Sequence, residues 1–500
     1  MKPSGTITKY YPFIDEESKS ILTPLMNESN SYNEFVHQLC EVVIENDVPV
    51  NLAYLAAVQA WWCRKDDLKD LIQEKFNKVP CIRPWAYPHN SVERDQITYH
   101  DAVVEAIDRA IDTNVEDWIE TELHLLHTFY HWPIGEISSA LEPFEKARGL
   151  IESNASLSCF LPLLYAFEAW AMAREGDIEK GLEILHKGEQ LVERYDDVLY
   201  KDMLLLTHAD ILIFARMDVQ GAMAIFEDLY KMVQELDLPY FICEVLHDST
   251  HAFEAAGEYD LAISSIQEII DSGKQFTLAE TNFVILSRNY ANLGNGSKAL
   301  AWINRGFDYC DQFESPFMLL SKAWALALVN RFDEADQTLE AAYSLIMKTG
   351  LERHLGDYYH ISGVVEFRKG ELFAALDLFE KAWEIAERDP QATNQNRALL
   401  GLARVEIEIS NQSKKNADVI VPGKWLSKLE KCATDRDLPG IRMQAALLKS
   451  EFYQKQGQLI DARTTLEEAL NITDSLGVRT LRKEIIAKIQ GIDESPEMTR

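Results

Sequence analysis

Residues 362–383 read S-G-V-V-E-F-R-K-G-E-L-F-A-A-L-D-L-F-E-K-A-W, and this stretch decides the fold. It predicts a helix, a tight turn at Gly370, and a second helix that carries Ala375, Phe379 and Ala382 on one stripe. Glycine suits a helix end that requires a positive φ angle. The stretch therefore predicts an antiparallel pair of helices, a helical hairpin.

The turn of this hairpin recurs along most of the chain. The intervals between successive turn residues are 41, 41, 40, 37, 36, 40 and 87 residues, and the last interval spans two periods with a degenerate unit near Ser410. Glycine dominates these positions, and asparagine also tolerates a positive φ. The turn residues are Gly135, Gly176, Met217, Gly257, Gly294, Asn330, Gly370 and Gly457.

A small–large–small pattern follows each turn. The fifth residue is small in every unit: Ala140, Gly181, Ala222, Ala262, Ala299, Ala335, Ala375 and Ala462. The ninth is large and apolar: Phe144, Leu185, Phe226, Ile266, Ile303, Leu339, Phe379 and Leu466. The twelfth is Ala or Gly in six units: Ala147, Gly188, Gly306, Ala342, Ala382 and Ala469. Two helices approach closely where a side chain is small, and stacked hairpins bury the faces that a single hairpin cannot.

This register resembles the tetratricopeptide repeat over about residues 114–472. The units of 36–41 residues exceed the family's usual length of about 34 residues, and are similar to those of MalT-type regulators, Rap-type regulators and kinesin light chains. The resemblance implies an all-α, right-handed superhelical solenoid of antiparallel hairpins with a concave ligand groove. The nucleotide-binding motif of the MalT type, GxxxxGK[ST], does not occur in the sequence.

Composition narrows the class of protein. The 500 residues are 47% hydrophobic and carry a net charge of −32, which fits a folded acidic protein and argues against a nucleic-acid partner. Seven scattered cysteines without a CxxC motif predict a reducing, cytoplasmic location. No run approaches about 18 apolar residues and the N-terminus lacks a signal-peptide core, so we expect no membrane partner.

The pattern predicts four parts of the chain. They are an N-terminal helical region (1–112), an array of about nine hairpins (113–472) with an inserted loop at 411–424, a capping helix (473–490) and a polar tail (491–500). Within the first part we expect irregular chain at 1–14, helices near 16–27, 32–46, 50–63, 66–77 and 99–112, and an extended loop at 79–91 rich in proline and aromatic residues. The aromatic residues of this loop either pack on the first helices or present a docking surface.

Five residues of the fourth hairpin are expected on the groove side if the family geometry holds. They are Glu244, His247, His251, Glu254 and Ala255. Two histidines at i and i+4 could bind a divalent metal, but Asp248 follows His247, so the HExxH motif is absent. A polar patch for hydrogen bonds to a ligand is the alternative that we favour.

The later hairpins place arginines at groove positions of a very acidic protein. A guanidinium fork suits a carboxylate or phosphate, which predicts an acidic peptide or another anionic ligand. The alternative is that these arginines pair with carboxylates on adjacent hairpins. The expected groove residues of this part are Arg288, Trp324, Asp357, His360, Phe367, Arg368, Arg397 and Arg404.

Three further histidines, His124, His127 and His131, share a helix face before Gly135. Their register places them against the second helix of the hairpin. We therefore expect packed histidines there, and not a three-histidine metal site.

No catalytic motif or cofactor-binding loop occurs in the sequence. The first hypothesis is thus a non-enzymatic scaffold that binds a peptide or protein segment in its groove. The second is a ligand- or peptide-sensing regulator whose superhelix changes shape on binding. A third is a metal-dependent activity at His247 and His251.

Overall fold

The computed structural model describes residues 4–86, 96–131, 137–216, 218–272, 279–309, 315–349, 354–388, 392–412, 423–435, 439–476 and 479–494. These residues form helices and no strand. The helices are α1 (Ser4–Thr8), α2 (Glu16–Glu28), α3 (Tyr32–Glu45), α4 (Val50–Trp62), α5 (Asp66–Lys75), η1 (Pro80–Ala86), α6 (Gln96–Ile111), α7 (Asp117–His131), α8 (Ile137–Ser153), η2 (Ala155–Phe160), α9 (Leu161–Arg174), α10 (Ile178–Tyr195), α11 (Val198–Ile211), η3 (Leu212–Arg216), α12 (Val219–Glu235), α13 (Pro239–Ala256), α14 (Tyr259–Asp271), α15 (Ala279–Asn292), α16 (Gly296–Tyr309), α17 (Pro316–Leu328), α18 (Phe332–Thr349), α19 (Leu355–Lys369), α20 (Leu372–Ala386), α21 (Ala392–Gln412), α22 (Lys424–Asp435), α23 (Pro439–Lys455), α24 (Leu459–Leu476) and α25 (Arg479–Asp493).

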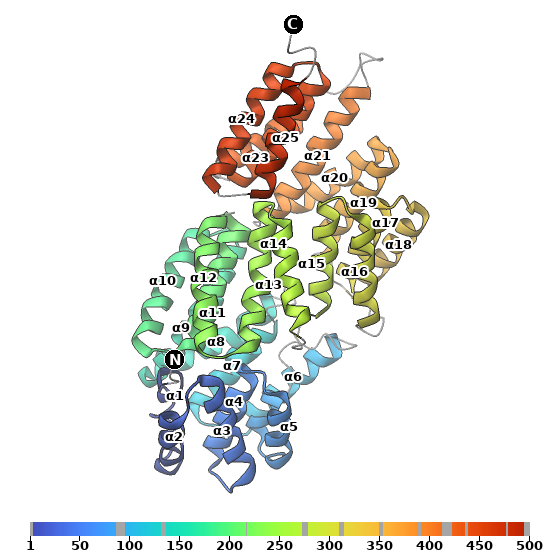
Figure 1. Cartoon of the computed structure of the whole chain (residues 1–500). Coiled ribbons are helices and arrows are strands. Elements are labelled where there is room, and N and C mark those ends of the chain that lie inside the picture. The colour runs from blue at the N-terminus through green and yellow to red at the C-terminus, as the bar shows by residue number, and fades with distance from the viewer. Residues whose placement is uncertain are drawn as a thin grey trace. The chain divides into compact units, whose positions relative to one another are not determined.

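The chain divides into two compact units. The N-terminal unit comprises Met1–Ala209, Ile225–Val245 and Lys274–Leu278, and the C-terminal unit comprises Asp210–Ala224, Leu246–Gly273 and Ala279–Arg500. In the C-terminal unit the two helices of each later hairpin pack together, as in α15–α16, α17–α18, α19–α20 and α23–α24 (Figure 1). The first helices α15, α17, α19, α21 and α23 also contact one another in succession, which is how hairpins stack in a helical-repeat protein.

The turns and the packing pattern predicted from the sequence are confirmed. The six turn residues that the structure describes all have positive φ, namely Gly176, Gly257, Gly294, Asn330, Gly370 and Gly457. Gly135 and Met217 lie outside the described residues. Every residue named above at the fifth, ninth and twelfth positions after a turn is buried. The pattern thus marks the contact between paired helices.

The prediction of irregular chain at residues 1–14 is wrong for residues 4–8 and correct for residues 9–14, which form turns and no helix; residues 1–3 lie outside the described residues. Ser4–Thr8 form α1, and Ile7, Tyr10 and Ile14 are buried in the N-terminal unit. The hydroxyl of Thr6 accepts a hydrogen bond from the backbone N–H of Val198 (3.1 Å). Contacts with residues far along the chain, which no local pattern encodes, order this segment.

The prediction of an extended loop at 79–91 is also wrong for the part that the structure describes. Residues Pro80–Ala86 form the 3-10 helix η1, whereas 87–91 lie outside the described residues. Trp85 is buried, and its ring meets those of Tyr54 (6.0 Å between centroids) and Trp61 (5.4 Å). Trp85 therefore packs on the preceding helices and does not present a docking surface, which confirms the first of the two alternatives for this residue.

Glu122 of α7 is a buried carboxylate in the core of the N-terminal unit. Tyr10 donates a hydrogen bond to its Oε1 (2.5 Å), while its Oε2 has no partner among the described residues. Burial raises the pKa of Glu122 to about 7, although Lys9 and the hydroxyls of Tyr10 and Tyr54 favour the charged form. The adjoining aromatic pocket has room for about one water molecule, so we do not assign a ligand to it.

We expect Glu122→Gln to flatten the pH dependence of stability between about pH 5 and 7. The folded-state pKa of about 7 exceeds the ordinary value of 4.5, so the folded state binds the proton more tightly. The wild-type protein should therefore lose stability as pH rises through this window, by roughly 3 kcal/mol. Urea unfolding of both proteins at pH 5 and pH 7.5 measures this difference, and parallel curves would contradict it.

The boundaries of the last units differ from the sequence prediction. Helix α21 continues to Gln412 and α22 begins at Lys424, so both ends of the predicted loop 411–424 are helical, and residues 413–422 lie outside the described residues. Residues 473–476 belong to α24, and the capping helix is α25, Arg479–Asp493, which takes three residues from the predicted tail. The rest of that tail, apart from Glu494, lies outside the described residues.

One segment of the described chain, Ala155–Arg174, is long and apolar enough to cross a membrane by length and composition. It consists of η2 and α9, half of its window is buried, and α9 packs against α10 as a core helix does. The described cysteines are free thiols, and Cys310 lies outside the described residues. Burial raises the pKa of Cys40, Cys81 and Cys159 to between about 11 and 12, so these thiols stay protonated and unreactive.

Candidate functional site

Charged side chains on the first helices of the C-terminal hairpins pair with one another. Arg288 of α15 holds Glu254 of α13 through two bonds, Nε to Oε1 (2.9 Å) and Nη2 to Oε2 (2.5 Å). Asn289 donates a further bond to Oε1 (2.7 Å). Burial would raise the pKa of Glu254, but Arg288 and His251 outweigh it and lower the pKa to about 2. Glu254 is therefore a fixed anion at neutral pH.

A second ion pair joins α19 to α21. Arg397 Nη1 lies 2.6 Å from Asp357 Oδ1, and both side chains are partly exposed. Asp357 also stabilises the positive charge of Arg288. Burial lowers the pKa of the Arg288 guanidinium, but Glu254 and, to a smaller extent, Asp357 raise it, and the net shift is upward. The residues Glu254, Arg288, Asp357 and Arg397 thus form a line of alternating charge, which we call the charge line. Arg288 and Arg397 therefore pair with carboxylates on adjacent hairpins, which was the stated alternative to ligand binding.

Arg368 and Arg404 differ from the arginines of the charge line. Both are exposed, and within the described part of the chain no carboxylate lies within ion-pair distance of either guanidinium. Arg404 lies on α21 near enough to His360 to disfavour its protonation. Of the four predicted groove arginines, these two can take an anion without breaking an existing pair.

His360 of α19 is half-buried, with its ring 5.4 Å from that of Phe379. Burial, together with Arg397 and Arg404, lowers its pKa to about 3. Its Nδ1 is buried and has no hydrogen-bond partner among the described residues. His360 is therefore a neutral imidazole beside the arginines.

Two aromatic residues expected in the groove take part in packing. Trp324 of α17 is half-buried against the core cluster of α17–α19, and Phe367 of α19 is half-buried against the cluster of α20–α23. Neither projects freely, because each fills space at the edge of a core.

The face of α13 that carries Glu254 lies against later hairpins of the same unit. Ala255 packs on the core cluster of α20–α23, and the π-helix η3 contacts α21. Segments roughly 150 residues apart in sequence are thus in contact. In this part of the C-terminal unit the expected groove residues therefore face other parts of the chain. This explains why Glu254, Arg288, Asp357 and Arg397 form ion pairs within the chain.

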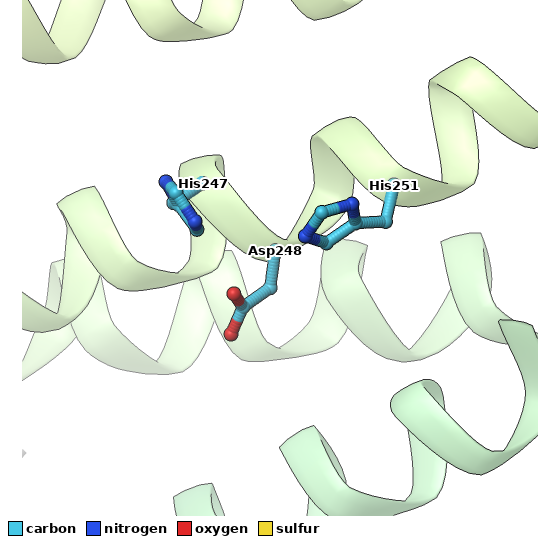
Figure 2. Close-up of side chains that lie close together, drawn as sticks. All are labelled: His247, Asp248 and His251. Carbon is cyan, nitrogen blue, oxygen red and sulfur yellow. The ribbon is translucent and has the colours of Figure 1, made fainter. Parts of the chain in front are cut away.

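His247, Asp248 and His251 of α13 form a cluster of metal-ligating side chains (Figure 2). One donor atom from each residue lies within 4.8 Å of the others. His247 is buried and donates from Nδ1 to Oδ1 of Asn282 on α15 (2.8 Å). Burial lowers its pKa to about 3, so its imidazole is neutral. The sequence predicts both histidines as possible ligands but not Asp248, because the i+1 spacing does not place Asp248 on their face in an ideal helix.

Glu244 belongs to the N-terminal unit, whereas the other expected site residues belong to the C-terminal unit. It is half-buried on α13 and lies close to Asp202 of α11. The pKa of Asp202 is raised, mainly by burial and in addition by the negative charge of Glu244. Asp202 is buried, and neither of its oxygens has a hydrogen-bond partner among the described residues. Sequence reasoning missed Asp202 because a lone aspartate in an apolar helix carries no motif.

The expectation of packed histidines before Gly135 is confirmed for one of the three. His124 is buried, and burial lowers its pKa to about 4. His127 is half-buried, and the side chain of His131 lies outside the described residues.

No protein-family model matches the chain, and no curated protein matches its sequence. Solved structures with a similar fold include a Rap protein complexed with competence and sporulation factor (15% identity, TM-score 0.42, covering 68% of this chain and 99% of that one). Human IFIT1, solved as a dimer with PPP-AAAA, shares 14% identity at a TM-score of 0.41, covering 81% and 87%. A STAND protein with a tetratricopeptide repeat sensor from Pyrococcus horikoshii shares 15% identity at 0.39, covering 74% and 52%.

At TM-scores below 0.5 these similarities do not indicate a function. The evidence for the fold comes from the hairpins of this chain. Helical hairpins with positive-φ turns, buried small–large–small positions and stacked first helices are the features of the tetratricopeptide arrangement. The chain is an all-α protein built from tetratricopeptide-like helical hairpins.

Proposed function

We propose that this protein is a non-enzymatic scaffold that binds an acidic peptide or protein segment along the first helices of its C-terminal hairpins. This proposal rests on one observation: Arg368 of α19 and Arg404 of α21 are exposed without a carboxylate partner among the described residues, whereas the arginines of the charge line, Arg288 and Arg397, are paired. The net charge of −32 repels anionic partners at long range, whereas the two guanidinium groups offer local positive sites for carboxylates. A reducing, cytoplasmic location remains part of this proposal.

The chemistry of the two arginines also suggests how a partner would be held. A guanidinium binds a carboxylate through two parallel hydrogen bonds, and each charge-assisted bond contributes about 1.5–3 kcal/mol. Carboxylates of Asp or Glu side chains spaced along a peptide fit this requirement. The neutral His360 nearby adds a polar group without adding charge.

We expect the double substitution Arg368→Ala with Arg404→Ala to weaken the binding of an acidic peptide at least tenfold. Fluorescence anisotropy with a panel of labelled Glu- and Asp-rich peptides measures this, at low and at physiological salt. The matched control is Arg305→Ala, which removes an exposed arginine of α16, a second helix outside the proposed surface, and should leave affinity unchanged. An equal loss in the control, or no binding by any peptide of the panel, would overturn the proposal.

A ligand-sensing regulator is the second candidate function, and the charge line favours it. The bridge between Asp357 and Arg397 joins two hairpins, so a ligand that takes Arg397 from Asp357 would loosen their contact. Small-angle scattering with and without a bound acidic peptide separates the two functions. A change in the radius of gyration supports the sensor, and an unchanged radius with binding intact supports the scaffold.

A further inference from the structure

The cluster of His247, Asp248 and His251 combines the ligand types of a transition-metal site. The two histidines stand one helical turn apart on α13, and in Figure 2 the Asp248 carboxylate lies below the two rings, at a horizontal position between them. The ring planes are nearly perpendicular, at 86°, with centroids 5.9 Å apart. Two donor atoms bound to one Zn²⁺ at about 2.0–2.1 Å would stand roughly 3.4 Å apart. Small side-chain rotations therefore close the cluster around an ion.

A hydrogen bond orients the ring of His247, and a carboxylate lies close to the ring of His251. The Nδ1–H of His247 is committed to Asn282, which leaves Nε2 as the ring nitrogen that would coordinate. His251 Nδ1 lies 3.8 Å from Glu254 Oε2, and Glu254 is itself held by Arg288 and Asn289. Histidine ligands of protein metals regularly direct their second nitrogen to such an amide or carboxylate oxygen, which fixes the ring orientation.

The local charge also permits a cation. Arg288 is a nearby positive group, and its pairing with Glu254 offsets its charge. Asp248 adds a further carboxylate to the cluster.

We propose that His247, Asp248 and His251 bind one divalent transition-metal ion, with Zn²⁺ as the probe. Two imidazoles and one carboxylate select this class of ion over Mg²⁺ and Ca²⁺, which prefer oxygen ligands. Three protein ligands leave at least one coordination position for water or another oxygen donor. The site does not depend on the peptide-binding function proposed above, because its ligands are distinct from Arg368 and Arg404.

Zinc binding by the full-length, chelator-treated protein tests the site without any peptide. Isothermal titration with ZnCl₂ should show one high-affinity ion per chain, and Co²⁺ should give the visible absorption of a histidine-bound ion. Asp248→Asn and His251→Gln should each weaken Zn²⁺ binding at least tenfold, and circular dichroism should show both variants folded. The matched control, His186→Gln, removes an exposed histidine of α10 and should bind as the wild type does.

Two results would overturn this site. One is the absence of a stoichiometric ion, with only weak binding to the many surface carboxylates that none of the variants alters. The other is a high-affinity ion that survives in both Asp248→Asn and His251→Gln, since the metal would then be held elsewhere.

Discussion

Replacing Lys9 with methionine is expected to destabilise the N-terminal unit by about 3–5 kcal/mol, because it leaves the Asp197 carboxylate buried without its counter-charge. Lys9 Nζ lies 2.5 Å from Asp197 Oδ2, and the two side chains are only 2% and 1% exposed. The ammonium also lies 3.4 Å from the ring centroid of Tyr200. Methionine preserves much of the aliphatic volume, so the loss reports on charge and not on packing.

Urea unfolding combined with hydrogen exchange over residues 4–14 and 197–200 measures this loss. The matched control is Lys19→Met, whose partner Glu16 is 89% exposed, and we expect it to cost less than about 1 kcal/mol. The double substitution Lys9→Met with Asp197→Asn should recover part of the loss, since it removes the unpaired charge. If Lys9→Met costs no more than Lys19→Met, the buried pair does not anchor the N-terminal segment.

Phe379→Ala is expected to destabilise the C-terminal unit by about 3–5 kcal/mol, the range for emptying a buried phenylalanine site. Phe379 is 3% exposed on α20. Two glycines leave room for its ring: a β-carbon at Gly363 would stand 2.9 Å from Cδ1 and Cε1, and one at Gly401 only 2.6 Å. The cavity is therefore bounded by two helix backbones, α19 and α21, which cannot collapse into it without shifting.

Chemical denaturation, with hydrogen exchange over α19–α21 as the local probe, checks this result, because a repeat array does not always unfold in one step. Phe373→Ala is the matched control: it removes the same residue type from the same helix, but Phe373 is 71% exposed. We expect its cost to be near zero. Gly401→Ala should be destabilising in the wild type and tolerated in the Phe379→Ala background, and additive effects would contradict the proposed contact.

The repeat could be predicted from sequence because its signals are local. A turn that needs positive φ, followed at fixed spacing by small and large residues, depends on contacts within one hairpin and the next. The turns at Gly176, Gly257 and Gly370 and the buried stripe Ala375–Phe379–Ala382 follow from that spacing alone. Eight repetitions of one register made the prediction strong where a single hairpin would not.

The candidate site was predictable only in part. Helical spacing showed that His247 and His251 share a face, but the contribution of Asp248 depends on the positions of its side-chain atoms. The register placed Arg288 and Arg397 on one side of their helices, yet their pairing with Glu254 and Asp357 depends on how neighbouring hairpins are set against each other. Phe367 and Trp324 were expected in the groove, and the structure shows both side chains partly buried against neighbouring core clusters.

By itself the sequence determined that this protein is a stack of helical hairpins, where each hairpin turns, and which residues lie between its two helices. Only the tertiary structure decided that residues 4–14 dock on a segment almost 190 positions away, and that only two of the predicted groove arginines lack a carboxylate partner among the described residues. The physical reason is the distance along the sequence over which each interaction acts. Turn geometry and close helix packing act between residues near in sequence, whereas ion pairs and metal-binding clusters require side chains that only the complete fold brings together.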